Sequence, residues 1–251
     1  MTETALMVDG LAVDFSGFRA VDGVSLAVAK GELRVLLGAN GAGKTTLMDL
    51  ISGRTRSTEG RVLVHGRDVT NWREFRIARA GIGRKFQIPS VFSGLTVRQN
   101  LEVALSRHPG VFANLRLRRR PADRARVAEV MALVGLEAEA EQEAGYLSHG
   151  QTQWLELGML MIQNPSVILL DEPTAGMTQA ETAKTAEIIN RLKGHHTLLV
   201  VEHDMAFVRE IAERITVLHL GRVLAEGSVD FIENNPEVRA AYLGTQGISA
   251  C

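Results

Sequence analysis

The chain has 251 residues, of which 45% are hydrophobic and 23% charged, and its formal net charge is −1. These values are typical of a globular protein with a large core, and they exclude the basic surplus of nucleic-acid-binding proteins. No run reaches the roughly 18 apolar residues of a membrane span, and the first residues lack a secretory signal pattern. Because the only cysteine is Cys251, we expect a cytosolic protein without an internal disulfide.

Strand signals dominate the first part of the chain. Alternating apolar residues predict strands around 11–15 and 24–28, with turn signals at Ser16-Gly17 and Asp22-Gly23. Residues 61–66 predict a further strand. We expect these segments to form a small antiparallel sheet beside the apolar strand that leads into a glycine-rich loop at residue 38.

A phosphate-binding loop follows the apolar strand 33–37. The pattern G-x-x-x-x-G-K-[ST] opens a predicted helix over 44–52, and the loop with its next residue comprises Gly38, Ala39, Asn40, Gly41, Ala42, Gly43, Lys44, Thr45 and Thr46. Glycines let backbone N–H groups turn inward around an anion, and the helix start favours phosphate. Lys44 is expected to reach the β- and γ-phosphates and Thr45 to bind Mg²⁺. The alternative is a glycine-rich turn without a ligand, which the flanking strand and helix disfavour.

Residues from about 89 to 160 have helical periodicity and no clear strand. A helix start is predicted at Pro121, and residues 154–162 are apolar nearly all round, which indicates a buried helix. The basic run 116–120 favours a solvated loop, with a patch for anionic lipid or a partner as the alternative. We therefore predict a helical insertion within one α/β unit.

The last third of the chain alternates strand and helix. Uniformly apolar runs predict strands over 167–170, 197–201, 215–220 and 223–224. Such runs are typical of a parallel sheet covered on both faces. The helix between the first two begins with the capping-box spacing of Thr178 and Glu181 and ends at Gly194.

Polar residues stand where two of these strands end. Asp171 at a carboxyl end is suited to hold Mg²⁺ together with Thr45, and Glu172 is the candidate to polarise a water against the γ-phosphate. The alternative for this acidic pair is charge at a helix start. His203 follows the next strand, and we expect it at the same sheet edge; its alternative is a structural histidine.

The segment Leu147-Ser148-His149-Gly150-Gln151 separates the remaining classes, since a small-molecule P-loop kinase has no need for it. With the phosphate loop, Gln87, Asp171-Glu172 and His203 in this order, the chain resembles the nucleotide-binding subunit of an ABC transporter. The resemblance implies that Gln87 contacts the metal and water, Glu172 is the catalytic glutamate, and His203 contacts the γ-phosphate. It also implies that Phe15 stacks on adenine; the alternative is a core residue of the first strand.

The resemblance implies an α/β fold of the RecA-like P-loop NTPase type. An antiparallel β subdomain and a core would span 1–88 and 161–251, and an inserted helical subdomain, 89–160, would carry the signature. Two cassettes, identical or different, would sandwich two ATP molecules with Mg²⁺, so that Ser148, Gly150 and Gln151 contact the partner's nucleotide. The implied partners are transmembrane permeases and, indirectly, an extracytoplasmic solute-binding protein, at the cytoplasmic face of the inner membrane; no nucleic acid is implied.

Two residues depart from the family pattern. His149 replaces the first glycine of L-S-G-G-Q, and Thr178 stands where aspartate is common. Residues 84–87 and 95–100 look like the importer ATPases for branched-chain amino acids. Residues 147–156, 175–178 and 201–205 are similar to the ATP-binding subunit of the urea importers within that group. We therefore predict an ATPase that powers uptake of a small polar solute, with urea first and branched-chain amino acids as the alternative. A lipid-export cassette and a non-transport P-loop ATPase are the rival functions.

Overall fold

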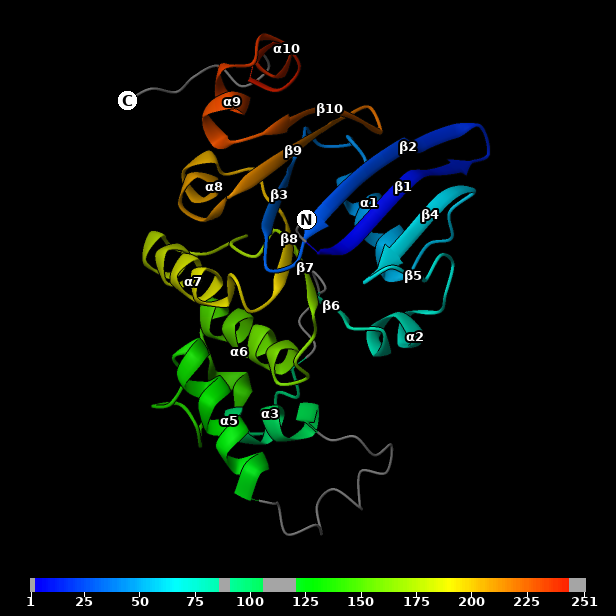
Figure 1. The fold of residues 1–251 in the computed structure, drawn as a ribbon. Helices are drawn as coiled ribbons and strands as arrows, with labels where there is room; N and C mark the ends of the chain where they lie inside the picture. The colour runs from blue at the N-terminus through cyan, green and yellow to red at the C-terminus, as the bar shows by residue number, and fades with distance from the viewer. Residues whose placement is uncertain (1–2, 86–90, 106–120, 244–251) are drawn as a thin grey trace. The chain divides into compact units, whose positions relative to one another are not determined.

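A computed structural model describes residues 3–85, 91–105 and 121–243. Contacts divide the chain into two compact units (Figure 1). The first unit comprises Met1–Arg84, Ser166–Pro173 and Leu192–Cys251, and the second comprises Lys85–Pro165 and Thr174–Arg191. Within the described ranges, none of the helices has the length and apolar character needed to cross a membrane.

The predicted antiparallel sheet is present in the first unit, with the strand order β2-β1-β4-β5. Its strands are β1 (Thr4–Phe15), β2 (Phe18–Ala29), β4 (Glu59–Val64) and β5 (Arg67–Asp68). Ser16 and Gly17, both at positive φ, form the two-residue turn between β1 and β2. The prediction of a second turn at Asp22-Gly23 is wrong, because Gly23 lies within β2, opposite a stretch of β1 where the pairing register shifts.

A six-stranded sheet forms the centre of the same unit, with the order β10-β9-β3-β8-β7-β6. The strands are β3 (Leu33–Leu37), β6 (Ile82–Lys85), β7 (Val167–Asp171), β8 (Thr197–Val201), β9 (Arg214–His219) and β10 (Arg222–Gly227). The pairs β9–β3, β3–β8 and β8–β7 are parallel, and every residue of β3, β7 and β8 is buried. The prediction from uniformly apolar strands is thus confirmed.

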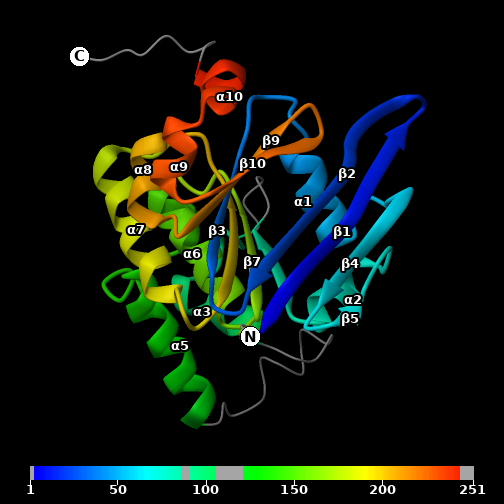
Figure 2. The same ribbon diagram turned by 45° about the horizontal axis from the view of Figure 1, so that its top comes forward.

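Helix α1 (Lys44–Ser52) begins directly after the phosphate loop and contacts both β2 and β7 (Figures 1 and 2). Its buried face carries the apolar residues Leu47, Met48, Leu50 and Ile51. Burial of this face against the two sheets holds the helix start, and with it the loop, in place. The remaining helices of the unit are α2 (Glu74–Arg79), α8 (Met205–Ile211), α9 (Val229–Asn234), α10 (Pro236–Val238) and a final helical turn, Arg239–Leu243.

The second unit is helical. It contains α3 (Val97–Leu105), α5 (Pro121–Val134), the turn Ala144–Tyr146, α6 (His149–Met161) and most of α7 (Gln179–Leu192). Helix α6 packs against α3 and α5, and Gly158 allows the close approach of Leu101 and Val130. The predicted buried helix around Trp154 is therefore confirmed, although it begins earlier, at His149.

Candidate functional site

The side chain of Lys44 folds back onto the phosphate loop. Lys44 Nζ donates hydrogen bonds to the carbonyl oxygens of Gly38, at 2.6 Å, and Ala39, at 3.0 Å. Gly43 has a φ of 102°, a conformation that side chains disfavour, and this turn carries the backbone from the loop into α1. Burial lowers the pKa of Lys44, and the nearby carboxylates of Glu172 and Asp171 partly oppose that shift.

Asp171 ends β7 with a carboxylate that the fold leaves unsatisfied. The residue is 4% exposed, and neither carboxylate oxygen has a hydrogen-bond partner among the described residues. Burial raises the pKa of Asp171, although the guanidinium of Arg84, at 3.8 Å, acts in the opposite direction. A buried carboxylate oxygen without a partner is suited to bind a cation.

Arg84 and Asp49 were not among the predicted site residues. Arg84 Nη1 donates to Asp49 Oδ1 at 2.6 Å and to Ser52 Oγ at 2.7 Å, both on α1. Arg84 therefore links the end of β6 to α1 while its other terminal nitrogen faces Asp171. Arg84 belongs to the stretch 84–87 that supported the family resemblance, and this was the one signal in the sequence that could have marked it as a site residue.

Glu172 and His203 lie near each other at the ends of neighbouring strands, as predicted. His203 Nδ1 is 3.7 Å from Glu172 Oε1, and the imidazole side chain is 60% exposed. Glu172 has a φ of 46°, which is strained for a residue with a side chain, and its N–H donates to the carbonyl of Val201 at 3.0 Å. The buried Glu202 is a further residue that sequence reasoning missed; its Oε2 accepts the His203 N–H at 3.0 Å.

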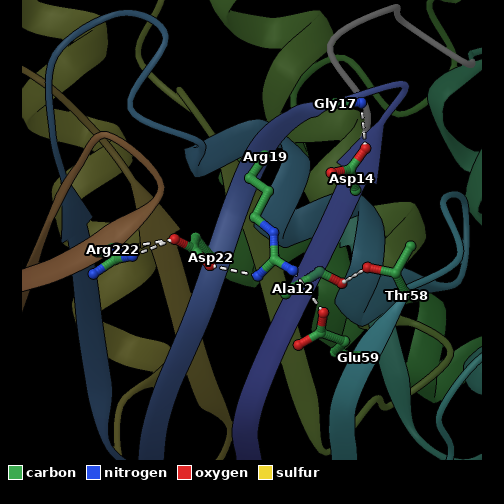
Figure 3. A network of polar contacts seen from close by, with 8 residues as sticks. All are labelled: Ala12, Asp14, Gly17, Arg19, Asp22, Thr58, Glu59 and Arg222. Atoms are coloured by element: carbon green, nitrogen blue, oxygen red, sulfur yellow. Dashed lines mark hydrogen bonds and ion pairs between the residues drawn. The ribbon is translucent and has the colours of Figure 1, made fainter.

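Phe15 lies at the tip of the β1–β2 hairpin and is 49% exposed, so it is not a core residue. A polar network fixes this hairpin (Figure 3). Arg19 donates to Asp22 and Glu59, and Arg222 of β10 makes two bonds to the other oxygen of Asp22, at 2.6 and 2.9 Å. These contacts join the hairpin to the six-stranded sheet and thereby hold the exposed aromatic side chain relative to the phosphate loop.

The signature segment forms the start of α6 in the second unit. Ser148 caps the helix by accepting the Gln151 N–H at 3.2 Å, and Gln151 Oε1 accepts the Ser148 N–H at 2.9 Å. This capping box satisfies two of the backbone N–H groups at the helix start. The unusual His149 has a defined partner, because its Nε2 lies 3.0 Å from the carbonyl oxygen of Ala175.

Two predictions concern residues outside the described ranges. Gln87 lies in the segment 86–90, and the basic run 116–120 lies in the segment 106–120. For the loop residues that remain, Asn40, Gly41 and Thr45 are exposed, Ala42 is buried, and Thr46 is partly buried.

Comparison with known proteins gives two family matches. The model for ABC transporters matches residues 21–175, and a model for branched-chain amino acid ATP-binding cassette transporters matches residues 222–247. The branched-chain amino acid transport ATP-binding protein LivG of Escherichia coli K12 is 37% identical over 255 residues, covering 97% of this chain and 99% of the relative. The corresponding protein BraF of Pseudomonas aeruginosa is 36% identical over 253 residues, with the same coverage.

Solved structures show the same fold. The crystal structure of the ADP conformation of an ATP-binding cassette of an ABC transporter has a TM-score of 0.84 and 29% identity, and the match covers 97% of this chain and 100% of that chain. A dimeric cassette bound to ADP and Pi in a post-hydrolysis state has a TM-score of 0.74 and 25% identity, covering 89% of this chain and 98% of that one. The fold expected from the sequence is therefore confirmed.

Proposed function

This chain belongs to the ABC transporter family as an ATP-hydrolysing cassette coupled to transport, and on that premise we propose that it powers the uptake of branched-chain amino acids. The observation that carries the choice of solute is the pair of relatives at 36–37% identity, both of which are branched-chain amino acid transport proteins over nearly their whole length. The match of residues 222–247 to the model for that transporter group supports it independently.

The urea importer predicted from residues 147–156, 175–178 and 201–205 receives no support from these relatives. The first of these segments lies at the start of α6, where it forms a capping box, and it contacts no transported solute in the mechanism proposed here. Its sequence therefore bears on nucleotide handling, whereas the solute is selected by the permeases and the binding protein.

We propose that ATP binds to the phosphate loop, with the adenine against the exposed face of Phe15. Lys44 would exchange the carbonyls of Gly38 and Ala39 for oxygens of the β- and γ-phosphates. Thr45 and the unsatisfied carboxylate of Asp171 would hold a magnesium ion, because oxygen atoms are the ligands that this ion prefers. When bound, Mg²⁺ would neutralise charge on the β- and γ-phosphate oxygens.

In the hydrolysis step, Glu172 would accept a proton from the attacking water, and His203 would donate a hydrogen bond to the γ-phosphate. The proximity of His203 Nδ1 and Glu172 Oε1, 3.7 Å apart, supports a common task for the two side chains. Gln87 would contact the metal and the water. A second cassette would supply its own Ser148, Gly150 and Gln151, so hydrolysis would depend on pairing, and permeases at the cytoplasmic face of the membrane would respond to it.

The proposal is tested by reconstituting the chain in vesicles with candidate permeases and a candidate solute-binding protein of the branched-chain amino acid type. We expect uptake of radiolabelled leucine that requires internal ATP and is absent with the Glu172→Gln variant. Urea is the matched alternative solute. Uptake of urea without uptake of leucine, isoleucine or valine would refute the choice of branched-chain amino acids while leaving the transport ATPase assignment intact.

A further inference from the structure

The signature segment, residues 147–151, contacts a carboxylate of its own chain. Ser148 Oγ donates to Glu181 Oε1 at 3.2 Å, although the two residues are 33 positions apart. The other oxygen, Oε2, accepts both the N–H and the hydroxyl of Thr178 at 2.9 Å. One carboxylate therefore serves two helices of the second unit: it completes the capping box of α7 and it lies at the N-terminus of α6.

The fit around this carboxylate is close. A side chain at Gly150 would collide with the carboxylate atoms of Glu181, so glycine at this position makes room for the acid. Hydrogen bonds lower the pKa of Glu181, first from the Thr178 backbone and hydroxyl, and then from the Ser148 hydroxyl and the Gly150 amide. The group is thus a stable anion at the positive end of a 13-residue helix.

A second contact holds the same two segments together. His149 Nε2 lies 3.0 Å from the carbonyl oxygen of Ala175, and the ring approaches the position that a side chain of Gly176 would take. The signature turn is therefore bound to residues 175–181 both through the histidine and through the carboxylate. The two departures from the family pattern, His149 and Thr178, both take part in this arrangement.

We propose that Glu181 occupies the anion site of the signature in the unpaired cassette, and that the γ-phosphate of the partner's ATP must displace it before the cassettes pair. The inference rests on the function proposed above, in which Ser148 and Gly150 contact the partner's nucleotide. Two anions cannot share the same donors, because their repulsion adds to the loss of the hydrogen bonds. Rotation of the carboxylate would release Ser148 while Oε2 keeps its contacts with Thr178.

This arrangement makes Glu181 a positioning residue that sets the ATP concentration at which dimers form. ADP lacks the γ-phosphate that displaces the acid, so the contact between Ser148 and Glu181 would re-form after hydrolysis and favour separation. The threshold for pairing is then adjusted by a residue whose side chain contacts Ser148 and Thr178 of its own chain.

The test uses the full chain with Glu172→Gln, so that ATP-bound dimers accumulate. Glu181→Gln is added, because glutamine is also accepted in a capping box and the fold is kept. Charge-assisted hydrogen bonds are roughly twice as strong as neutral ones, so we expect the ATP concentration for half-maximal dimerisation to fall about fivefold. Glu187→Gln, an exposed position on the same helix, is the matched control and should leave this concentration unchanged.

A second variant and a second measurement separate this role from a structural one. Glu181→Ala removes the acid entirely and should also lower the ATP threshold, even though the loss of the α7 cap lowers the unfolding temperature. Binding of a fluorescent ADP analogue to the monomer should be the same in all variants. An unchanged or higher threshold in both Glu181 variants would overturn the proposal, whereas failure of the Glu172→Gln parent to dimerise with ATP would overturn the proposed function instead.

Discussion

The buried carboxylate of Asp171 leads to the clearest stability prediction, because no hydrogen bond from the part of the chain that the structure describes offsets the cost of its burial. Both oxygens lack a hydrogen-bond partner among the described residues, and the nearest cation, Arg84, is 3.8 Å away and already engaged by Asp49. We expect Asp171→Asn to stabilise the protein in the absence of nucleotide and Mg²⁺, and to abolish Mg²⁺-dependent hydrolysis. Stability and activity would thus change in opposite directions at one residue.

The magnitude follows from the cost of an unsatisfied buried group, which is about 1–3 kcal/mol and more when the group is charged. Asparagine leaves a neutral amide of similar size without a partner and loses the attraction to Arg84, so the substitution removes only part of that cost. We expect a gain of about 1 kcal/mol in the free energy of unfolding, which corresponds to a rise of about 2–4 °C in the melting temperature at this chain length.

The sign of the pH dependence provides a second check. Burial raises the pKa of Asp171 in the folded state, so the folded protein holds the proton more tightly than the unfolded chain. The destabilisation is therefore absent below the unfolded pKa of about 3.9 and grows as the pH rises through the folded value. Thermal unfolding with and without MgATP, at pH 4 and pH 7, measures this. A melting temperature for Asp171→Asn at or below that of the parent at pH 7 would refute the reasoning.

Four further predictions concern the nucleotide site. Lys44→Ala should lose binding of a fluorescent ATP analogue. Glu172→Gln should keep this binding, hydrolyse ATP at least about 10²-fold more slowly, and accumulate as an ATP-bound dimer in size-exclusion chromatography. Normal ATP turnover in either variant would contradict the mechanism. Gly43→Ala should lower the free energy of unfolding in urea by about 2 kcal/mol, because φ is 102° and the new Cβ would meet the Ala20 carbonyl. Phe15→Ala should weaken ATP binding about tenfold by loss of stacking and leave tripolyphosphate binding unchanged; an equal loss for both ligands would argue against adenine stacking.

The parts of the fold that could be predicted depend on local patterns. Strands β3, β7 and β8 are continuous apolar runs, and the structure buries every residue in them. The capping box of Thr178 and Glu181 is also local, since its residues are three positions apart, and both reciprocal bonds are present. In such cases the sequence neighbours are also the neighbours in space.

The parts that could not be predicted depend on contacts between distant residues. The link from Arg84 to Asp49 and Asp171 spans three elements, and no spacing rule brings those side chains together. The hydrogen bond from Ser148 to Glu181 is hidden for the same reason, even though the spacing of Thr178 and Glu181 had indicated a helix cap. The Asp22-Gly23 pair misled the prediction because the same residue types occur in turns and in irregular strands.

These distant contacts have a common character at the sites where ATP is proposed to bind. The ammonium of Lys44 is bonded to the loop's own carbonyls, and the hydroxyl of Ser148 to the protein's own carboxylate. Nucleotide binding would then exchange one set of hydrogen bonds for another, so its net free energy is smaller than the sum of the new contacts. Such an exchange favours a repeated cycle of ATP binding and release, because the internal partners can bond to Lys44 and Ser148 again after the γ-phosphate has been cleaved. The carboxylate of Asp171 has no hydrogen-bond partner among the described residues that a metal ion would have to replace. Binding of the metal ion would therefore contribute more net free energy than the contacts of Lys44 and Ser148 with phosphate.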